Sequence, residues 1–350
     1  MQPPPPSDAD QAAWSSVPWT AVADPDTTNT GSITPIGWHK AGIPYLPLGQ
    51  ALTLQTLDVW IPTTSNTTTP PTPSSIPNPS GTWVLYIHGG AWRDPRIAST
   101  SFTPTATTLL RRLQQHQHHP PPTQKIAGLI SLNYRLSPHP SFPENATSPS
   151  HTATHPAHIT DVLTALSFLH RLHIRPQILT GHSCGATLAF QAVMAPARWG
   201  LSPHGFEFEK PRVVVGFNGL YDLAGFIADP PEGYEGLREG YREFVEGAFG
   251  AEEGVWRAVC PTTAGGGWVG EWEEGLVGGG GKGVEVVLVQ SREDGLVPYG
   301  QLEGLRRVLE GEGVMVGVRE AGGEHDAIWM EGERMAEVLW EVVERLAGSE

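Results

Sequence analysis

The sequence contains few cysteines, no long apolar run and too few basic residues to offset the acidic ones. Two cysteines, Cys184 and Cys260, cannot build a disulfide framework, which fits a reducing compartment. No apolar run approaches the roughly 18 residues that span a bilayer, and the proline-rich start lacks the basic and apolar segments of a secretory signal. A formal net charge of −15 would repel nucleic acid and anionic membranes. We therefore expect a cytoplasmic protein that binds neither.

Proline and glycine, by contrast, are abundant and gather in a few stretches. Residues 1–50 contain Pro, Asp and Thr with isolated tryptophans and no periodicity, so we expect a mostly irregular N-terminal arm. Residues 62–81 are almost entirely Pro, Thr, Ser and Asn, a composition that predicts a flexible surface loop. The region 220–283 is rich in Gly, Glu and Trp and is interpreted as an inserted cap.

Short apolar runs alternate with helical patterns along the remainder of the chain. The runs have little internal alternation, which is typical of strands buried on both faces of a parallel sheet. We expect strands at 54–61, 83–88, 126–134, 177–180, 213–217, 284–289 and 314–318, and helices at 101–113, 156–172, 186–195 and 335–346. This order predicts an α/β fold with a mostly parallel, doubly wound sheet covered by helices on both faces, as a single domain over 51–350.

The segment Gly181-His182-Ser183-Cys184-Gly185 matches the GxSxG pattern, in which a serine occupies a strained turn between a strand and a helix. A predicted strand precedes this segment and a predicted helix follows it, as the pattern requires. The alternative is a glycine-rich helix start in which Ser183 is only an N-cap. The context favours Ser183 as a nucleophile of the α/β-hydrolase type.

A serine hydroxyl needs a base, and His325 follows a predicted strand in a glycine-rich turn near the C-terminus. Asp294 stands in the corresponding turn after the preceding strand. The chain order Ser, Asp, His is that of the α/β-hydrolases, so we predict Ser183, Asp294 and His325 as the catalytic residues. Glu293 is the rival acid, and Asp326 is a less favoured orienter of the histidine.

Acyl transfer also needs N–H donors directed at the oxyanion. The turn His88-Gly89-Gly90-Ala91 after an early strand resembles the glycine-rich turn that supplies such donors in this class. Gly89 and Gly90, together with the backbone of Cys184, are the expected oxyanion hole. The alternative is an ordinary turn at the end of a strand.

A group of potential metal ligands lies before and within the helix expected at 156–172. Its members are His151, His155, His158 and Asp161. Pro156 is expected to begin the helix, which leaves the first two histidines in a loop without a scaffold. We expect neither a metal nor any other cofactor, and the role of this histidine group stays open.

Three segments resemble the fungal kynurenine formamidases, a branch close to the hormone-sensitive-lipase-like esterases: HGGAWRDP at 88–95, NYRLSPHP at 133–140 and GHSCGATLAFQ at 181–191. The resemblance covers about residues 55–346. It implies hydrolysis of N-formyl-L-kynurenine to L-kynurenine and formate, in tryptophan breakdown toward NAD, by the three predicted catalytic residues. It also makes Trp92 and Arg93 candidates for binding the substrate's ring or carboxylate, with packing and surface charge as the alternative.

Two other functions compete with this expectation. A general carboxylesterase would use the same residues, and a non-catalytic ligand-binding protein could keep the fold without the chemistry. The intact serine, aspartate and histidine argue against the second. The sequence leaves open whether the chain forms a homodimer and which residues select the amino acid end of the substrate.

Overall fold

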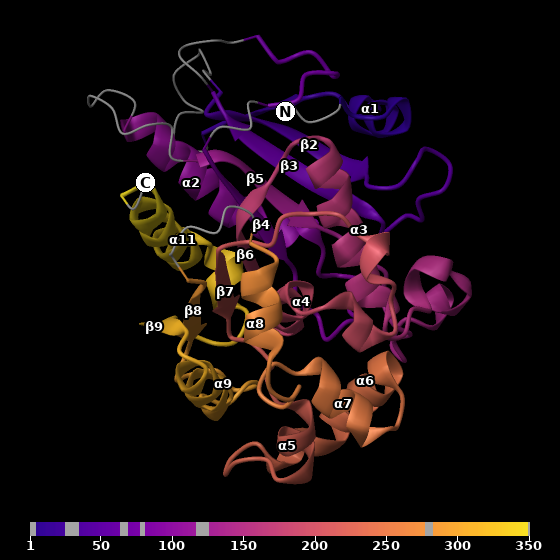
Figure 1. The fold of residues 1–350 in the computed structure, drawn as a ribbon, viewed down its shortest axis with the longest axis vertical. Coiled ribbons are helices and arrows are strands. Elements are labelled where there is room, and N and C mark those ends of the chain that lie inside the picture. Colours follow the sequence, from indigo (N-terminus) through magenta and orange to yellow (C-terminus); the bar gives the residue numbers. More distant parts are fainter. Residues whose placement is uncertain are drawn as a thin grey trace.

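The computed structural model describes residues 5–24, 35–63, 69–77, 81–116, 126–276 and 283–348. Within these ranges the strands form one nine-stranded sheet with the order β1-β2-β3-β5-β4-β6-β7-β8-β9 (Figure 1). Their bounds are β1 Thr20–Val22, β2 Gly37–Pro44, β3 Thr56–Pro62, β4 Thr82–Ile87, β5 Ile126–Leu132, β6 Pro176–His182, β7 Val213–Phe217, β8 Glu285–Gln290 and β9 Met315–Glu320.

The sheet has a parallel body and an antiparallel edge. The strands from β5 through β4, β6, β7 and β8 to β9 pair in parallel, whereas β1, β2 and β3 are antiparallel to their neighbours. Every residue of β5 and β7 is buried, which agrees with their continuous apolar sequences, IAGLISL and VVVGF. Because parallel strands end at the same edge, the loops after β6, β8 and β9 meet at one side of the molecule.

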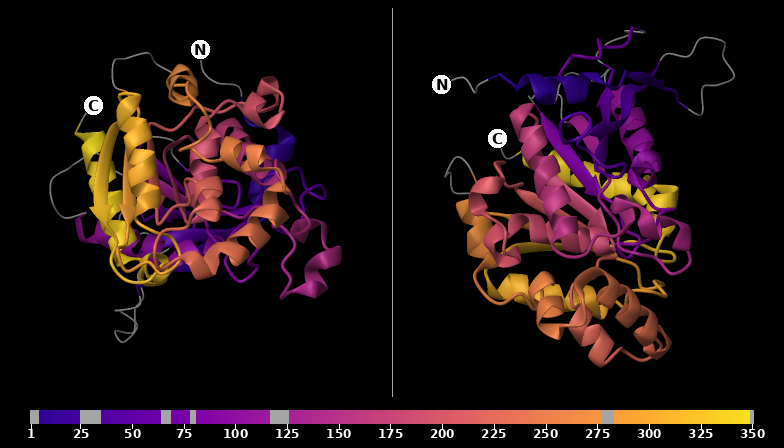
Figure 2. Two further views of the ribbon diagram at one scale, coloured as in Figure 1. Left: turned by 90° about the horizontal axis from the view of Figure 1, so that it is seen from below. Right: turned by 90° about the vertical axis from the view of Figure 1, so that its right-hand side faces the viewer.

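Helices cover both faces of the sheet, as predicted (Figure 2). One face packs against α2 Thr103–His116, α10 Ala327–Glu331 and α11 Glu333–Ala347. The other packs against α3 Ala157–Arg171, α4 Cys184–Val193, α8 Trp268–Glu274 and α9 Gly300–Gly311. Short 3-10 helices lie at Ser99–Phe102, Pro143–Thr147, Pro149–His151, Pro196–Trp199, Pro203–Gly205 and Glu235–Leu237. In the described ranges, no helix combines the length and the apolar character needed to cross a membrane.

The connection from β7 to β8 contains a group of helices that forms the cap, namely α5 Leu223–Ala228, α6 Arg238–Phe249 and α7 Glu253–Val259, followed by α8. The first three lie together at one end of the molecule (Figure 1). The apolar side of α6, with Tyr241, Phe244, Val245 and Ala248, is buried against the main core. The cap is therefore packed onto the sheet, and its helices lie within the region 220–283 that was interpreted as an insertion.

The N-terminal arm, expected to be mostly irregular, includes regular elements among its described residues. It contains α1 Asp8–Ser15, and β1 and β2 extend the sheet beyond β3. Trp14 and Trp19 are buried, and their rings lie 4.6 and 5.1 Å from the ammonium of Lys40, which donates to the carbonyl of Trp14 at 2.7 Å. Isolated tryptophans give no periodic signal, and their burial depends on a lysine more than 20 residues away, which a local pattern does not reveal.

The loop expected at 62–81 is described only in part, since residues 64–68 and 78–80 lie outside the described ranges. Residues 69–74 are largely exposed, in agreement with a surface position. However, the carbonyl of Ser75 accepts a hydrogen bond from Trp14 Nε1 at 2.9 Å, and that of Pro73 accepts one from Lys40 Nζ at 2.7 Å. This part of the loop is thus attached to α1 and to β2.

Candidate active site

Ser183 lies between β6 and α4 in a strained backbone conformation, with φ 55° and ψ −124°. This is unfavourable for a residue with a side chain, and such strain concentrates at functional sites. The two glycines of the motif explain how the turn closes. A Cβ at position 181 would lie 2.2 Å from the carbonyl oxygen of Gly185, and one at position 185 would lie 2.2 Å from that of Ile87. The elbow therefore requires glycine on both sides of the serine.

His325 and Asp294 lie in the loops after β9 and β8 and are in direct contact. His325 Nδ1 donates to Asp294 Oδ2 at 2.7 Å, and both side chains are buried. The backbone N–H groups of Leu296 and Val297 donate to Asp294 Oδ1 at 2.9 and 2.8 Å, and Gln290 Nε2 donates to Oδ2 at 3.1 Å. These donors fix the carboxylate so that one oxygen faces the imidazole, which orients the ring as a general base requires.

The two rival acids make other contacts. Glu293 accepts a hydrogen bond from the N–H of Gly323 at 2.8 Å, and Asp326 accepts one from Trp329 Nε1 at 2.9 Å. The structure therefore gives Asp294 the hydrogen bond to His325 and gives Glu293 and Asp326 other hydrogen-bond partners.

The serine elbow and the histidine loop are joined through the backbone of His325. Its carbonyl oxygen accepts hydrogen bonds from His182 Nε2 and from Asn218 Nδ2, both at 2.9 Å. Asn218 follows β7, and its side-chain oxygen accepts the N–H of Ser291 at 3.0 Å. Burial, followed by the nearby His325, lowers the pKa of His182 to about 3, so this ring is neutral. Sequence analysis missed Asn218, although a polar residue directly after a buried central strand was an available signal.

The turn after β4 lies against the elbow. A Cβ at Gly89 would approach the Cβ of Ser183 to 3.2 Å, and Gly90, Ala91 and Trp92 all have positive φ values. The hydroxyl of Tyr134 donates to the carbonyl oxygens of His88 and Gly89 at 3.1 and 3.3 Å. In a trans peptide the N–H points opposite to the C=O, so the N–H groups of Gly89 and Gly90 point away from Tyr134.

Cys184 is the first residue of α4, and its backbone N–H has no acceptor within the helix. Its thiol belongs to the core. Sγ accepts a hydrogen bond from the N–H of Trp92 at 3.3 Å, and burial raises the pKa of the thiol to about 11. Cys184 can thus offer a backbone donor, while its protonated side chain is unsuited to nucleophilic attack.

Trp92 and Arg93 connect this turn to the cap. Trp92 is fully buried, with its ring centroid 4.9 Å from that of Phe249 and 6.1 Å from that of Phe244. Arg93 forms an ion pair with Glu243 at 3.3 Å. The burial of Trp92 favours the packing alternative over substrate contact for this residue.

The histidine group near α3 is dispersed among other partners. His158 Nε2 hydrogen-bonds to Ser137 Oγ at 3.0 Å, Asp161 forms an ion pair with Arg135 at 2.7 Å, and the His155 ring packs against Trp199 and Phe249. In the described part of the chain, a three-residue group with metal-ligand atoms within 4.8 Å of one another is formed instead by His182, His325 and Asp326. That group includes the histidine already paired with Asp294.

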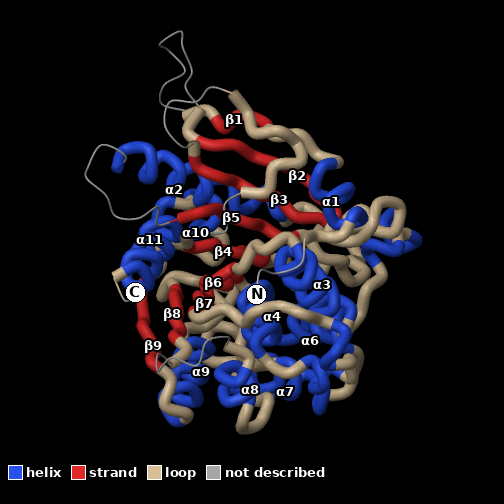
Figure 3. Tube along the Cα trace, turned by 45° about the horizontal axis from the view of Figure 1, so that its top comes forward, coloured by secondary structure: helices blue, strands red, loops and turns tan. Residues whose placement is uncertain are grey.

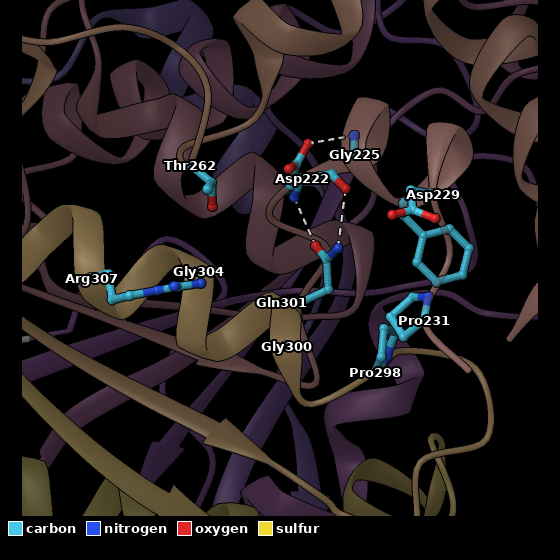
Figure 4. Close-up of a pocket in the computed structure, with 11 residues that line it drawn as sticks. Asp222, Gly225, Asp229, Pro231, Thr262, Pro298, Gly300, Gln301, Gly304 and Arg307 are labelled. Atoms are coloured by element: carbon cyan, nitrogen blue, oxygen red, sulfur yellow. Dashed lines mark hydrogen bonds between the residues drawn. The ribbon is translucent and has the colours of Figure 1, made fainter. Parts of the chain in front are cut away.

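Two cavities lie near the loops at this edge. His325 lines a cavity of about 490 Å³ together with Leu296, Glu324, Met330 and Glu331. A second cavity of about 260 Å³ lies between α5 and α9 and has none of the three predicted catalytic residues in its wall (Figure 4). There the side-chain amide of Gln301 is satisfied by the backbone of Tyr221 and Asp222. The first cavity is therefore the one that contains a predicted catalytic residue, His325, in its wall.

No protein-family model matches the chain. It is 34% identical over 310 residues to the kynurenine formamidase-like hydrolase fscH of Fusarium equiseti, covering 85% of this chain and 92% of the relative. It is 32% identical over 271 residues to the kynurenine formamidase avaC of Aspergillus versicolor, covering 72% of this chain and 84% of the relative.

Solved structures agree on the fold. A truncated carbohydrate esterase from gut microbiota superposes with a TM-score of 0.57 at 18% identity, covering 93% of this chain and 99% of that one. Esterase B from Lactobacillus Rhamnosis gives a TM-score of 0.57 at 15% identity, covering 97% and 91%. At such low identity these similarities support the α/β-hydrolase fold alone.

Proposed function

Since the chain belongs to the kynurenine formamidase family of α/β-hydrolases, we propose that it is a serine hydrolase that cleaves N-formyl-L-kynurenine to L-kynurenine and formate. The observation that carries this proposal is the 2.7 Å contact between His325 Nδ1 and Asp294 Oδ2, in a loop bonded to the strained elbow of Ser183. An imidazole oriented by a carboxylate, in a loop that is bonded to the serine elbow, fits the arrangement that activates a hydroxyl for attack on a carbonyl carbon.

In the proposed reaction, Ser183 Oγ attacks the formyl carbon while His325 Nε2 takes the hydroxyl proton. Asp294 stabilises the imidazolium that forms. The N–H groups of Gly89, Gly90 and Cys184 bind the oxyanion, which is consistent with their directions in the turn and at the start of α4. His325 then protonates the departing aryl amine, and the formyl group stays on the serine.

The second half of the reaction returns the enzyme to its starting state. Water enters, His325 removes one of its protons, and the resulting hydroxide attacks the formyl ester of Ser183. Formate leaves and the serine recovers its proton from the imidazolium. Both steps use the same donors, so no metal or organic cofactor is needed for this chemistry.

The choice of substrate is supported by the family and by the cavity beside His325. The Aspergillus versicolor relative is a kynurenine formamidase by name, and the Fusarium equiseti relative is named a kynurenine formamidase-like hydrolase. The cavity combines the apolar side chains of Leu296 and Met330 with the carboxylates of Glu324 and Glu331. Such a surface suits a leaving group with an aromatic ring and an ammonium.

The test measures formate released from N-formyl-L-kynurenine by the wild type and by Ser183→Ala. We expect steady turnover by the wild type and a loss of about 10⁴-fold or more in kcat for the variant, because removal of the nucleophile leaves only binding and the oxyanion donors. Ser141→Ala, at an exposed position, is the matched control and should keep full activity.

A parallel assay with p-nitrophenyl acetate separates the formamidase from a general carboxylesterase, which would use the same residues. Efficient cleavage of the ester alone would overturn the formamidase assignment but would leave the assignment as a serine hydrolase intact. Absence of turnover on both substrates by the folded wild type would overturn the hydrolase itself.

A further inference from the structure

Two tyrosine hydroxyls of the cap contact the loop that carries Asp294. We define this acid loop as residues 294–297. Tyr234, shortly before α6, donates to the carbonyl oxygen of Asp294 at 2.6 Å, and Tyr241, within α6, donates to that of Leu296 at 2.7 Å. From this geometry we infer that Tyr234 and Tyr241 are positioning residues, which hold the Asp294 carboxylate in register with His325. The inference rests on the proposed function, because it acts through those two side chains.

The Leu296–Val297 peptide shows how the effect reaches the carboxylate. Its oxygen accepts the hydroxyl of Tyr241 at 2.7 Å, and its N–H donates to Asp294 Oδ1 at 2.8 Å. One rigid, planar unit is therefore held at both edges. A hydrogen bond accepted at the oxygen also polarises the peptide and strengthens the donor on the other side. Loss of the tyrosine hydroxyl would free the peptide to tilt and would weaken its bond to Oδ1.

A shift at Oδ1 changes the contact at Oδ2, because the two oxygens belong to one planar carboxylate. Oδ2 receives His325 Nδ1 at 2.7 Å and Gln290 Nε2 at 3.1 Å. Gln290 Nε2 also donates to the carbonyl oxygen of Val297 at 2.9 Å, so the loop is closed on its inner side by the sheet. The hydroxyls of Tyr234 and Tyr241 hold the loop from the cap.

The tyrosine rings are themselves held by aromatic packing within the cap. The ring of Phe226 stacks on Tyr241 with a centroid separation of 4.0 Å and meets Tyr234 edge-on at 6.3 Å. Phe244, one turn further along α6, lies 4.8 Å from Tyr241 and 6.1 Å from Trp92. The cap thus contacts both the acid loop and the turn of Gly89 and Gly90. Burial raises the pKa of both tyrosines, so their hydroxyls remain donors at neutral pH.

The experiment replaces each tyrosine by phenylalanine, singly and together, since Tyr234→Phe and Tyr241→Phe remove the hydroxyl but keep the ring and its packing. Tyr45→Phe is the matched control, because Tyr45 is also buried and its hydroxyl donates to a backbone carbonyl, that of Asn133, away from the acid loop. On N-formyl-L-kynurenine we expect kcat to fall about threefold to tenfold in each single variant and further in the double variant. KM should stay within about twofold.

A second readout does not require turnover. The Nδ1 proton of His325 should give a downfield proton resonance, assigned by its loss in Asp294→Asn. We expect it to shift or broaden in the double tyrosine variant and to be unchanged in Tyr45→Phe. The apparent pKa on the acid limb of the pH profile of kcat/KM should change in the same double variant. A general loss of stability would not change it.

The outcomes distinguish failure of the positioning role of Tyr234 and Tyr241 from failure of the proposed function. Wild-type kcat together with an unshifted resonance in the double variant would overturn the inference while leaving the hydrolase intact. A shifted resonance in a protein that does not hydrolyse N-formyl-L-kynurenine would support the positioning role of the tyrosines and would contradict the proposed substrate. An equal loss of kcat in Tyr45→Phe would show that the effect is structural and would also overturn it.

Discussion

Asp294 and Glu293 are neighbours in the chain, yet their carboxylates have different partners. Asp294 contacts His325, whereas Glu293 accepts a hydrogen bond from the N–H of Gly323, in the turn that precedes His325. Asp294→Asn should lower kcat by about 10³-fold to 10⁴-fold, because an amide at Oδ2 would present a donor to Nδ1 and favour the wrong tautomer. Steady-state kinetics on N-formyl-L-kynurenine would measure the effect.

Glu293→Gln is the matched control for this prediction and should keep kcat within a few fold, since an amide oxygen can still accept the N–H of Gly323. A larger loss of kcat in Glu293→Gln than in Asp294→Asn would mean that the acid has been assigned to the wrong carboxylate.

At the scale of single residues, positions with a motif were accessible to sequence analysis and their supporting partners were not. The pattern GxSxG and the chain order of serine, aspartate and histidine predicted which side chains to look for, and the structure joins Asp294 to His325. Their catalytic roles stay predictions. Tyr234 and Tyr241 carry no local signature, because each donates to a backbone carbonyl of a segment more than 50 residues away. Asn218 and Gln290 stand at the ends of buried strands, and their partners are not apparent from the sequence.

At the scale of elements, the cap docks on the start of α3 through an aromatic contact that includes His155. The N–H of His155 donates to the carbonyl of Ala248 in α6, and its ring lies 5.5 Å from those of Trp199 and Phe249. Burial lowers the pKa of His155 to about 4, and its Nδ1 has no hydrogen-bond partner. The contact therefore holds a neutral imidazole.

This contact predicts a loss of stability in acid. Because the pKa of His155 is near 4 in the folded chain and near 6.5 when unfolded, the unfolded state binds more protons between these values. The free energy of unfolding should thus fall by up to about 1.4 kcal/mol per pH unit as the pH drops through this window. His155→Phe keeps a ring against Trp199 and Phe249 and should flatten that slope.

Urea unfolding curves at several pH values from 7 to 4 would measure this slope for the wild type and for His155→Phe. His204→Phe is the comparison variant, because it makes the same substitution at an exposed histidine. Identical slopes in the wild type and His155→Phe would contradict the assignment. The other buried histidines, His88, His158 and His182, titrate in the same direction and should keep part of the slope in all variants.

Elements with strong patterns were predicted within a few residues, and weakly patterned ones were missed. The strand at 213–217 has the predicted bounds, and the strong apolar stripe of α11 gave the helix at 335–346, which extends over Glu333–Ala347. Sequence analysis did not predict α9, where Gly300, Gly304 and Gly311 reduce helix propensity. It also missed α1, β1 and β2. The buried tryptophans Trp14 and Trp38 in α1 and β2 follow no period.

At the scale of the whole molecule, the class of fold could be predicted but the strand order could not. Alternating buried strands and amphipathic helices require a parallel sheet covered on both faces, and that layering is visible in Figure 3. The placement of β4 between β5 and β6, and the antiparallel edge of β1, β2 and β3, depend on crossovers between segments far apart in sequence. Local patterns carry no information on those pairings.

The overall arrangement brings four connections to one edge of a single sheet. The elbow after β6, the loops after β8 and β9, and the turn after β4 come from parallel strands, so their positions relative to one another are set by the sheet. The central claim is that this edge makes Ser183 a nucleophile by means of His325.

Covalent labelling by a fluorophosphonate, read by intact mass and peptide mapping, tests that claim most directly, because the reagent reacts much faster with an activated serine than with an ordinary one. We predict one adduct per chain, on Ser183, in the wild type, no adduct in Ser183→Ala, and labelling slowed by about 10³-fold or more in His325→Gln. A folded wild-type protein that takes up no label, or takes it up at another residue, or reacts equally fast without the imidazole, would contradict it.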